Sequence, residues 1–225
     1  MSIMLSSNTR PLLRPMRIML GVLAVLVLVQ VVLRVFRRAA PEPMPWRLAP
    51  MLTTRWRSRL FGAPEQVLDR AGVAPGMHAL EVGPGPGMYT VALAKRVASS
   101  GEDGRVTCVE IQPQMIEMLR ERLRAAEVRN VEVIQGDGQR IPLSDGTFDL
   151  IFLVDVVGEI LDKPTFFSEC TRVLKPGGIL AVTEQISDPD FQLPSTVRTL
   201  APDAGLGEDG WAGLPWWTYT ARFRK

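Results

Sequence analysis

Glycine stands at every second position of the stretch GPGPG, residues 83–87, directly after a short apolar run that contains Glu81. Glycines at this spacing let the backbone pass close beneath a ligand, and the helix expected next offers unpaired N–H groups. We therefore expect Gly83, Gly85 and Gly87 to form a binding loop, with an ordinary strand-to-helix turn as the alternative. The G-x-G-x-G spacing differs from the G-x-G-x-x-G of dinucleotide sites.

Three acidic residues follow later apolar runs and could hold the polar groups of a nucleoside. Glu110 stands 23 residues after Gly87, where an acid accepts both hydroxyl hydrogens of a ribose. Asp137 lies in a Gly-Asp-Gly turn and could accept from an exocyclic amine. Asp155 and the nearby Glu159 could line a pocket. The alternatives are surface acids, a plain turn and the cap of the next helix.

These residues are connected by alternating strand and helix patterns. Such a rhythm predicts an α/β fold with a doubly wound, mostly parallel sheet and right-handed crossovers. Because ligands bind at the carboxyl ends of parallel strands, we expect the four clusters to meet at one edge. The expected strands are residues 78–82, 105–110, 131–135, 149–154 and 179–184, and the expected helices are 89–97, 113–126 and 163–174. Two short strands, 206–211 and 216–223, predict an antiparallel C-terminal hairpin around a turn at 212–215.

The ordered set LEVGPGPG, CVEI, GDGQRIPLSDGTFDLIFLVDVV and RVLKPGGILAVTE resembles the class I S-adenosylmethionine-dependent methyltransferases. Within that class it is most similar to the quinone-biosynthesis and small-molecule group. The resemblance covers roughly residues 63–225 and implies a Rossmann-like methyltransferase fold with S-adenosylmethionine as cofactor. The quinone enzymes carry Asn and His near the position where this chain has Asp155-Val156-Val157-Gly158-Glu159.

The resemblance also assigns roles to residues. It places Glu81, Gly83, Gly85 and Gly87 around the methionine moiety of the cofactor and Glu110 on its ribose. It further places Ile111 against the adenine, Asp137 at the adenine amino group with Gly138 beside it, and Asp155 near the methionine end. No catalytic residue follows from it, and Glu159 is the general base to test first.

Charge divides the 225-residue chain in two. Residues 1–62 carry ten arginines and one acid, a net charge of +9, whereas residues 63–225 carry 16 basic and 23 acidic residues, a net charge of −7. Such asymmetry indicates two environments. The acidic second part argues against a nucleic-acid partner. One histidine and two cysteines give neither a metal pattern nor a disulfide framework, so we expect no metal.

Sixteen uncharged residues, Ile18 to Leu33, lie between arginines. With residues up to 36 included, and with the flanking arginines snorkelling, they predict a transmembrane helix over 18–36. A cleaved signal peptide is the second interpretation, but Arg38-Ala39-Ala40 has an arginine where a small residue is needed. A buried core helix is the weakest, because the run is apolar on every face. The arginine bias predicts a single-pass membrane protein with its catalytic domain on the cytosolic side.

The resulting organisation is a basic flank (1–17), the transmembrane helix (18–36), a Pro/Arg-rich juxtamembrane linker (37–62) and a methyltransferase domain (63–225). We expect residues 18–62 to contact membrane lipids, with Trp46, Trp56 and Phe61 as interfacial anchors, against the alternative of a charged turn packed on the domain. Because no substrate-binding insert is evident between residues 185 and 205, segment 46–62 is the expected cap of the site.

The sequence thus predicts a membrane-anchored methyltransferase. Its acceptor would be a small, hydrophobic or amphipathic molecule, lipid-like or quinone-like. The alternative is a membrane-tethered cofactor-binding or scaffold protein that keeps the fold without turnover. A nicotinamide-dependent oxidoreductase is disfavoured by the glycine spacing and by the lack of a Tyr-Lys or His proton donor.

Overall fold

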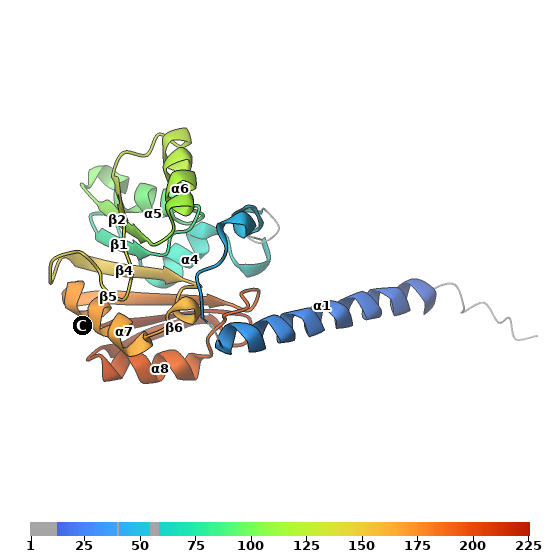
Figure 1. Ribbon diagram of the computed structural model, residues 1–225. Helices are drawn as coiled ribbons and strands as arrows, with labels where there is room; N and C mark the ends of the chain where they lie inside the picture. The colour runs from blue at the N-terminus through green and yellow to red at the C-terminus, as the bar shows by residue number, and fades with distance from the viewer. Residues whose placement is uncertain (1–12, 40, 55–58) are drawn as a thin grey trace, which may run out of the picture. The chain divides into compact units, whose positions relative to one another are not determined.

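The computed structural model describes residues 13–39, 41–54 and 59–225, and the chain divides into two compact units, residues 1–40 and 41–225. In the described residues of the first unit, helix α1 (Leu13–Ala39) is the only element. Large apolar side chains of α1, such as Ile18, Val25 and Leu28, are exposed to solvent. The second unit holds the sheet and every predicted site residue (Figure 1).

The prediction of a transmembrane helix over residues 18–36, in a single-pass protein with a cytosolic catalytic domain, is wrong. Among the helices in the described part of the chain, none combines the length and the apolar character that a membrane crossing needs. The physical reason lies in the arginines that flank the apolar stretch of α1. Its sixteen uncharged residues rise ~24 Å as a helix, whereas a bilayer core is ~30 Å thick.

The second unit contains one seven-stranded sheet, in the order β3-β2-β1-β4-β5-β7-β6. The first five strands pair in parallel, and β7 pairs antiparallel with both β5 and β6. This arrangement confirms the predicted doubly wound, mostly parallel sheet with an antiparallel C-terminal hairpin. The strands are β1 (His78–Val82), β2 (Arg105–Glu110), β3 (Val131–Gln135), β4 (Phe148–Val154), β5 (Leu174–Gln185), β6 (Gly207–Leu214) and β7 (Thr218–Arg224).

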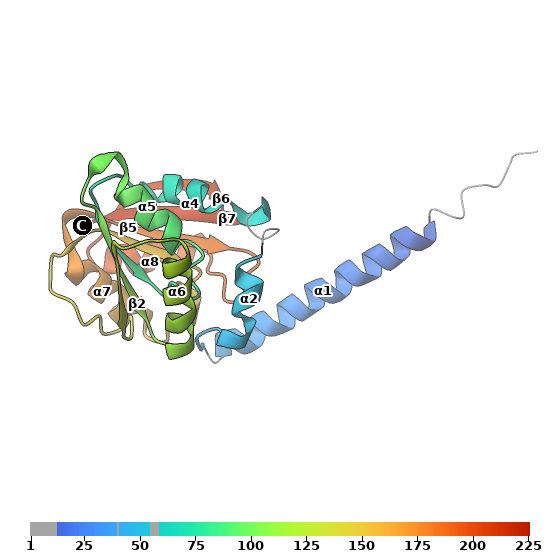
Figure 2. The ribbon, with the colours of Figure 1, turned by 90° about the horizontal axis from the view of Figure 1, so that it is seen from above.

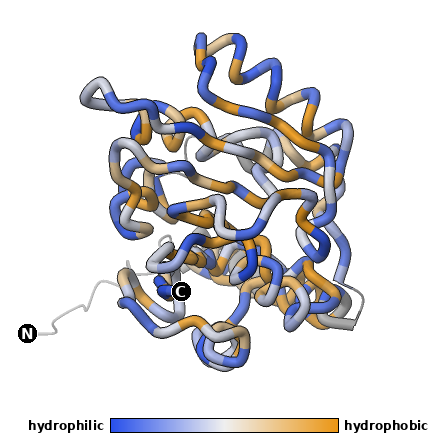
Figure 3. The backbone as a smooth tube through the Cα atoms, turned by 90° about the vertical axis from the view of Figure 1, so that its left-hand side faces the viewer, coloured by the Kyte–Doolittle hydropathy of each residue, from blue (hydrophilic) through white to orange (hydrophobic). Residues whose placement is uncertain are grey.

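Helices pack on both faces of the sheet and separate two apolar cores. Buried residues of α4 (Pro64–Ala71), α5 (Thr90–Val97) and α6 (Pro113–Ala125) join one core, and those of α7 (Lys163–Val173) and α8 (Pro194–Asp203) join the other. Figures 1 and 2 show α7 and α8 lying apart from α4 and α5. The hydrophobic colour in Figure 3 follows the central strands, as expected for strands buried on both faces.

The parallel register brings five strand ends to one edge of the sheet. Glu81 is level with Cys108 of β2 and Phe152 of β4, and Glu110 is level with Gln135 of β3. The segments that follow β1, β2, β3, β4 and β5 therefore leave the sheet side by side. We call this side the carboxyl edge, and it is where open α/β sheets bind ligands.

The C-terminal hairpin differs in detail from its prediction. Strand β6 continues to Leu214 and β7 begins at Thr218, so the turn lies at residues 215–217 instead of 212–215. Gly213 has φ 92°, a left-handed conformation that keeps glycine in the strand. Because β7 is antiparallel to β5 and Thr218 is level with Gln185, the hairpin tip lies at the carboxyl edge.

The segment before the sheet is only partly a linker. A 3-10 helix η1 (Trp46–Leu48) and a short helix α2 (Ala49–Leu52) follow the prolines. Phe61, expected as a lipid anchor, is instead buried and stacks on Trp217 with ring centroids 5.1 Å apart. That expectation is therefore wrong for Phe61, because the hairpin supplies an aromatic partner. Trp56 lies outside the described residues.

Candidate functional site

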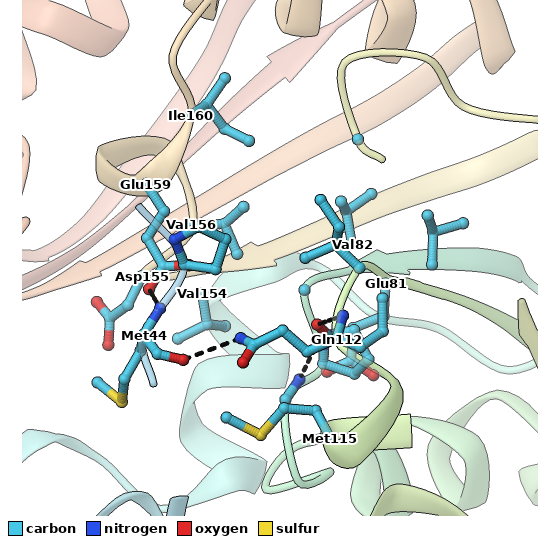
Figure 4. Close-up of a pocket in the computed structure, with 18 of the residues that line it drawn as sticks. Met44, Glu81, Val82, Gln112, Met115, Val154, Asp155, Val156, Glu159 and Ile160 are labelled. Carbon is cyan, nitrogen blue, oxygen red and sulfur yellow. Dashed lines mark hydrogen bonds between the residues drawn. The ribbon is translucent and has the colours of Figure 1, made fainter. Parts of the chain in front are cut away.

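A cavity of about 290 Å³ opens at the carboxyl edge, around the ends of β1, β2, β3 and β4 (Figure 4). Eight of the nine predicted site residues line it, and Gly87 does not. The predicted residues on its wall are Glu81, Gly83, Gly85, Glu110, Ile111, Asp137, Gly138 and Asp155. Further lining residues that the sequence did not single out for the site include Pro41, Pro43, Met44, Met88, Gln112, Met115, Ile160, Leu161 and Asp188.

The glycine loop leaves room in the cavity because its backbone is left-handed. Gly83 has φ 66° and Gly85 has φ 54°. A Cβ on Gly85 would meet no atom within 4 Å, so the space above it is open to a ligand. At Gly83 a Cβ would come within 2.9 Å of Val156 Cγ2, which couples this turn to the segment after β4. The loop therefore has the open backbone that the GPGPG spacing predicts.

Gly87, the third glycine of the loop, packs against α6. Its φ is 79°, and a Cβ there would lie 2.5 Å from Leu119 Cδ1 on α6. Leu119 is completely buried. Glycine at this position therefore lets α6 pack against the start of the helix after the loop, and the residue is not part of the cavity wall.

Glu110 is fixed at the end of β2 by two backbone amides. Its Oε2 accepts from the Gly85 amide at 3.0 Å, and its Oε1 accepts from the Gln112 amide at 2.9 Å. Burial raises the pKa of Glu110, and these hydrogen bonds act against the rise. The carboxylate thus bridges the glycine loop and the segment after β2. A carboxylate has about four lone-pair positions, so both oxygens can still accept hydrogen bonds from a diol.

Ile111, the next residue, lines the cavity with nearly half of its surface exposed. Such an apolar side chain beside a ribose-binding acid is suited to contact with a flat base. The contact with adenine that the resemblance implies for Ile111 stays a prediction.

Glu81 is a buried acid beneath the glycine loop. Burial raises its pKa to about 7, while the nearby Thr90 hydroxyl and Cys108 thiol lower it and the charge of Glu110 raises it further. The Cys108 thiol lies 3.7 Å from Glu81 Oε2. Glu81 therefore holds its proton to a higher pH than an exposed glutamate does, and a nearby positive charge would favour its ionised form.

Asp137 and Gly138 lie on the cavity wall after β3. Asp137 Oδ1 accepts from the Gln139 amide at 2.8 Å, which fixes the turn. A Cβ on Gly138 would come within 2.9 Å of Phe166 Cε2, so glycine is needed there for the packing of α7. Gln139 Nε2 also lies 3.4 and 3.3 Å from the two oxygens of the Asp137 carboxylate, and the contact of this carboxylate with the adenine amine stays a prediction.

Asp155 follows β4 with φ 56°, an uncommon conformation for a residue with a side chain. Its Oδ1 accepts from the Gln185 amide at 2.8 Å, and its own amide donates to the Thr183 carbonyl at 2.9 Å. Glu184 lies nearby on β5, where burial and then the charge of Asp155 raise its pKa. Strained backbone of this kind is concentrated at functional sites.

Residues 41–44, which we call the strap, form one wall of the cavity. The Met44 amide donates to Glu159 Oε1 at 3.0 Å, and Gln112 Nε2 donates to the Met44 carbonyl at 2.9 Å (Figure 4). Segment 46–62 was the expected cap, but none of its described residues lines the cavity. The prolines before Trp46 are the sequence feature that could have indicated this wall. They hold the backbone extended and leave its polar groups free to bond with side chains.

The ionisable groups that line the cavity, among the residues described, are six carboxyl groups and Tyr89. The carboxyl groups belong to Glu81, Glu110, Asp137, Asp155, Glu159 and Asp188. Such a wall favours a cationic ligand, and the apolar remainder favours flat or aliphatic groups. These acceptor groups fit S-adenosylmethionine, which carries a ribose diol, an adenine amine and positive charges at its methionine end. Within the described residues, no three His, Cys, Asp or Glu side chains are grouped to hold a metal ion.

Comparisons with known proteins show what the chain is similar to. The family described as "Methyltransferase domain" matches residues 80–182. The chain is 35% identical over 129 residues to a demethylmenaquinone methyltransferase of Staphylococcus aureus, covering 57% of this chain and 48% of the relative. It is 34% identical over 152 residues to a ubiquinone/menaquinone biosynthesis C-methyltransferase of Cronobacter sakazakii, covering 61% of this chain and 59% of the relative. The chain thus spans about half the length of the relatives it matches.

Solved structures show the same fold. A SAM-dependent methyltransferase from Aquifex aeolicus is 27% identical with a TM-score of 0.72, and the match covers 80% of this chain and 98% of that one. A structure described as a sarcosine dimethylglycine methyltransferase from Galdieria sulphuraria is 21% identical with a TM-score of 0.61, over 72% of this chain and 84% of that one. This second likeness shows the fold alone.

Proposed function

Because this chain contains a class I S-adenosylmethionine-dependent methyltransferase domain, we propose that it methylates a quinone-like acceptor that is hydrophobic or amphipathic. S-adenosylmethionine is the cofactor, and when bound it supplies an activated methyl group on a sulfonium. The observation that supports the acceptor class best is the cavity itself. It combines a glycine loop and a fixed acid with apolar walls formed by residues such as Met88, Val156, Ile160 and Leu161.

The chain contributes mainly by positioning and electrostatics. We propose that Glu110 and Asp137 hold the nucleoside, and that Glu81 and Asp155 hold the charged methionine end. Holding two reactants in alignment can account for a large part of a rate enhancement, because it removes the entropic cost of their encounter. Apolar side chains limit the access of water to the cavity, and the strap forms one of its walls.

Proton removal from the acceptor falls to a carboxylate or to solvent. Among the described residues on the cavity wall, there is no histidine, lysine or cysteine. Methylation of a reduced quinone at oxygen releases the proton of that hydroxyl, whereas methylation at a ring carbon releases the hydrogen of that carbon as a proton. Glu159 and Asp188 are the carboxylates outside the proposed nucleoside and methionine contacts.

The relatives support the acceptor class through their names, which describe demethylmenaquinone and ubiquinone/menaquinone biosynthesis methyltransferases. The chain spans only about half of their length, so the acceptor is inferred from two sources together. One is this likeness, and the other is the apolar cavity.

The direct test is methyl transfer from methyl-labelled S-adenosylmethionine to reduced naphthoquinones and benzoquinones that lack a ring methyl group. The full chain should label at least one of them, and the Glu110→Ala variant should lose most of the label. Cofactor binding by calorimetry without transfer to any reduced quinone would overturn the proposed acceptor class. A parallel screen of phenols and amines would then show which acceptor replaces it.

A further inference from the structure

The methionine end of S-adenosylmethionine carries a carboxylate as well as positive charges, and the cavity wall is poorly suited to an anion. Among the described residues on that wall, the charged side chains are the six carboxyl groups, and there is no lysine, arginine or histidine. A carboxylate placed among other carboxylates is repelled, and burial adds to the cost unless hydrogen-bond donors hold it. Neutral donors on the wall are therefore needed for this group.

The amides of the glycine loop already donate within the protein. In residues 83–87 each glycine amide has an acceptor at 2.9 or 3.0 Å, and the two prolines have no N–H. The acceptors are, in chain order, the Val109 carbonyl, Glu110 Oε2 and the Pro84 carbonyl. The loop thus gives a ligand space, and the donor for a carboxylate has to come from another part of the wall.

Three neutral side chains on the described part of the wall carry an N–H or O–H donor, namely those of Tyr89, Gln112 and Gln139. Gln112 donates to the Met44 carbonyl at 2.9 Å, and Gln139 lies against the Asp137 carboxylate. These two glutamines follow β2 and β3, where the nucleoside contacts are proposed. Tyr89 is therefore the side-chain donor suited to the methionine end.

Tyr89 is buried at the start of α5, and both its ring and its hydroxyl are held in place. Its ring meets that of the completely buried Phe152 edge-on, with ring centroids 6.0 Å apart. Gln185 Nε2 donates to the Tyr89 hydroxyl oxygen at 2.9 Å. Because this bond uses a lone pair of the oxygen, the hydroxyl hydrogen is directed toward a different acceptor. The contact with Gln185 thus presents Tyr89 as a donor.

Gln185 also connects Tyr89 to Asp155, the acid proposed for the methionine end. Its backbone amide donates to Asp155 Oδ1 at 2.8 Å, while its side chain donates to Tyr89. Gln185 is completely buried at the end of β5. One residue therefore holds an acceptor suited to a cation and a donor suited to an anion, and both of these side chains line the cavity. An α-amino acid carries its ammonium and carboxylate groups on one carbon, so it matches such a pair.

We propose that Tyr89 donates a hydrogen bond to the carboxylate of the cofactor's methionine moiety while Asp155 accepts from its ammonium group. Gln185 is the positioning residue, because it holds both side chains and does not itself line the cavity. This inference rests on the proposed function, which places the methionine end at Asp155. It adds that the anionic half of that end is bound by a side chain outside the glycine motif.

Calorimetry on the full chain tests the contact with two ligands, S-adenosylmethionine and decarboxylated S-adenosylmethionine, which lacks the carboxylate. Tyr89→Phe removes the hydroxyl and should weaken S-adenosylmethionine binding by roughly 10–100-fold, the value for a hydrogen bond to a charged group. The decarboxylated ligand should bind equally to the parent and to the variant. The readout is the ratio of the two affinities, because the acidic wall acts on the charge of each ligand in parent and variant alike.

Tyr219→Phe is the matched control. Tyr219 is the other tyrosine of the chain, is buried and donates to the Gln192 carbonyl at 2.9 Å, but does not line the cavity. Its variant should keep the ratio, even where it lowers the free energy of unfolding. Gln185→Met removes the donor to Tyr89 and keeps the backbone amide that holds Asp155. It should lower the ratio by roughly 2–10-fold, the value for a neutral hydrogen bond.

The outcomes separate this inference from a packing role and from the proposed acceptor. If Tyr89→Phe weakens both ligands equally, or neither, the inference is overturned, because its hydroxyl then makes no contact with the carboxylate. An unchanged ratio in Gln185→Met, beside a lowered ratio in Tyr89→Phe, overturns the positioning role of Gln185. Thermal unfolding shows which variants are folded, and Gln185→Met carries the test if Tyr89→Phe is not.

The measurement needs no acceptor. If no reduced quinone is methylated but the ratio falls in Tyr89→Phe, the proposed acceptor class is wrong and the contact of Tyr89 with the carboxylate stands.

Discussion

The Met44 amide donates a hydrogen bond to Glu159 Oε1 at 3.0 Å, joining residues 115 positions apart in the chain. The Met44 carbonyl accepts from Gln112, whose own amide donates to Glu110. One line of contacts therefore runs from the end of β2 through the strap to the segment after β4. Through it, the acid proposed for the ribose and the acid proposed as base both hold the wall of the cavity.

Removal of the Glu159 carboxylate should loosen the strap. Hydrogen bonds to charged groups contribute about 1.5–3 kcal/mol, so Glu159→Ala should speed release of S-adenosylmethionine by roughly 10–100-fold. Glu159→Gln keeps an acceptor oxygen and should stay within ~3-fold of the parent. Stopped-flow displacement measures both rates. If Gln and Ala abolish turnover equally and leave release unchanged, Glu159 is the general base and not a positioning residue.

Loss of Glu110 should weaken cofactor binding. Glu110→Ala removes the acceptor for the ribose and also leaves the amides of Gly85 and Gln112 without their carboxylate. Because the group is buried, the dissociation constant should rise by roughly 10–100-fold. Glu117→Ala on the exposed face of α6 is the matched control and should bind normally. Calorimetry gives both dissociation constants. Equal affinities for the two variants would show that Glu110 does not bind the cofactor.

Glu81 should make stability fall as the pH rises. Its pKa is about 7 in the folded chain, above the ordinary value of 4.5, so the folded state holds the proton that the unfolded state releases between these values. By linkage, about 3 kcal/mol of stability is lost from pH 4.5 to 7, with no further loss above. Glu81→Gln should flatten this dependence in urea unfolding at pH 5 and pH 8. An unchanged slope in the variant would show that Glu81 does not carry it.

The same group should make cofactor affinity depend on pH. A cationic ligand favours the ionised carboxylate, so S-adenosylmethionine should bind more tightly at pH 8 than at pH 6. S-adenosylhomocysteine lacks the sulfonium charge and should show a smaller change. Calorimetry on both ligands, with Glu81→Gln as the control, tests the difference. Equal pH dependence for the two ligands would show that the Glu81 carboxylate does not interact with the sulfonium charge.

Gly158 should tolerate alanine less well than Gly85. A Cβ at Gly158 would lie 2.1 Å from the Asp190 carbonyl oxygen, and neither backbone can give way easily. At Gly85 the space is open and only the left-handed φ opposes alanine, at about 1–2 kcal/mol. Gly158→Ala should lose at least ~3 kcal/mol of unfolding free energy. Urea denaturation ranks the two variants, and the reverse order would contradict the packing of these loops.

Residues with strong local patterns were predicted well from the sequence. The bounds of β2 and β3 match their apolar runs, and the glycine loop and its acids come together because parallel strands share an edge. Helix α8 escaped prediction because Pro194, Pro202 and β-branched residues give it a weak helical pattern. Only Val197 and Ala201 of that helix are buried, one turn apart, so tertiary packing stabilises it.

The strap and Phe61 could not be placed from the sequence for a different reason. The strap is held through the backbone of Met44, and backbone groups carry no sequence signal. The sequence around Phe61 is the same whether its ring faces solvent or packs on the hairpin. Its partner Trp217 is far along the chain, so no local pattern indicates the contact. The charged flanks of α1 suggested a membrane span, although its uncharged stretch is short.

The position of the strap has a consequence for how such enzymes can diversify. The matched family segment begins at residue 80, yet the wall made by residues 41–44 comes from chain that precedes it. The side chains proposed to contact the cofactor and the wall made by the strap are thus encoded in separate stretches of the gene. A chimaera that exchanges only the strap could inherit the old cofactor with a new acceptor, and chains with near-identical motifs need not share a substrate.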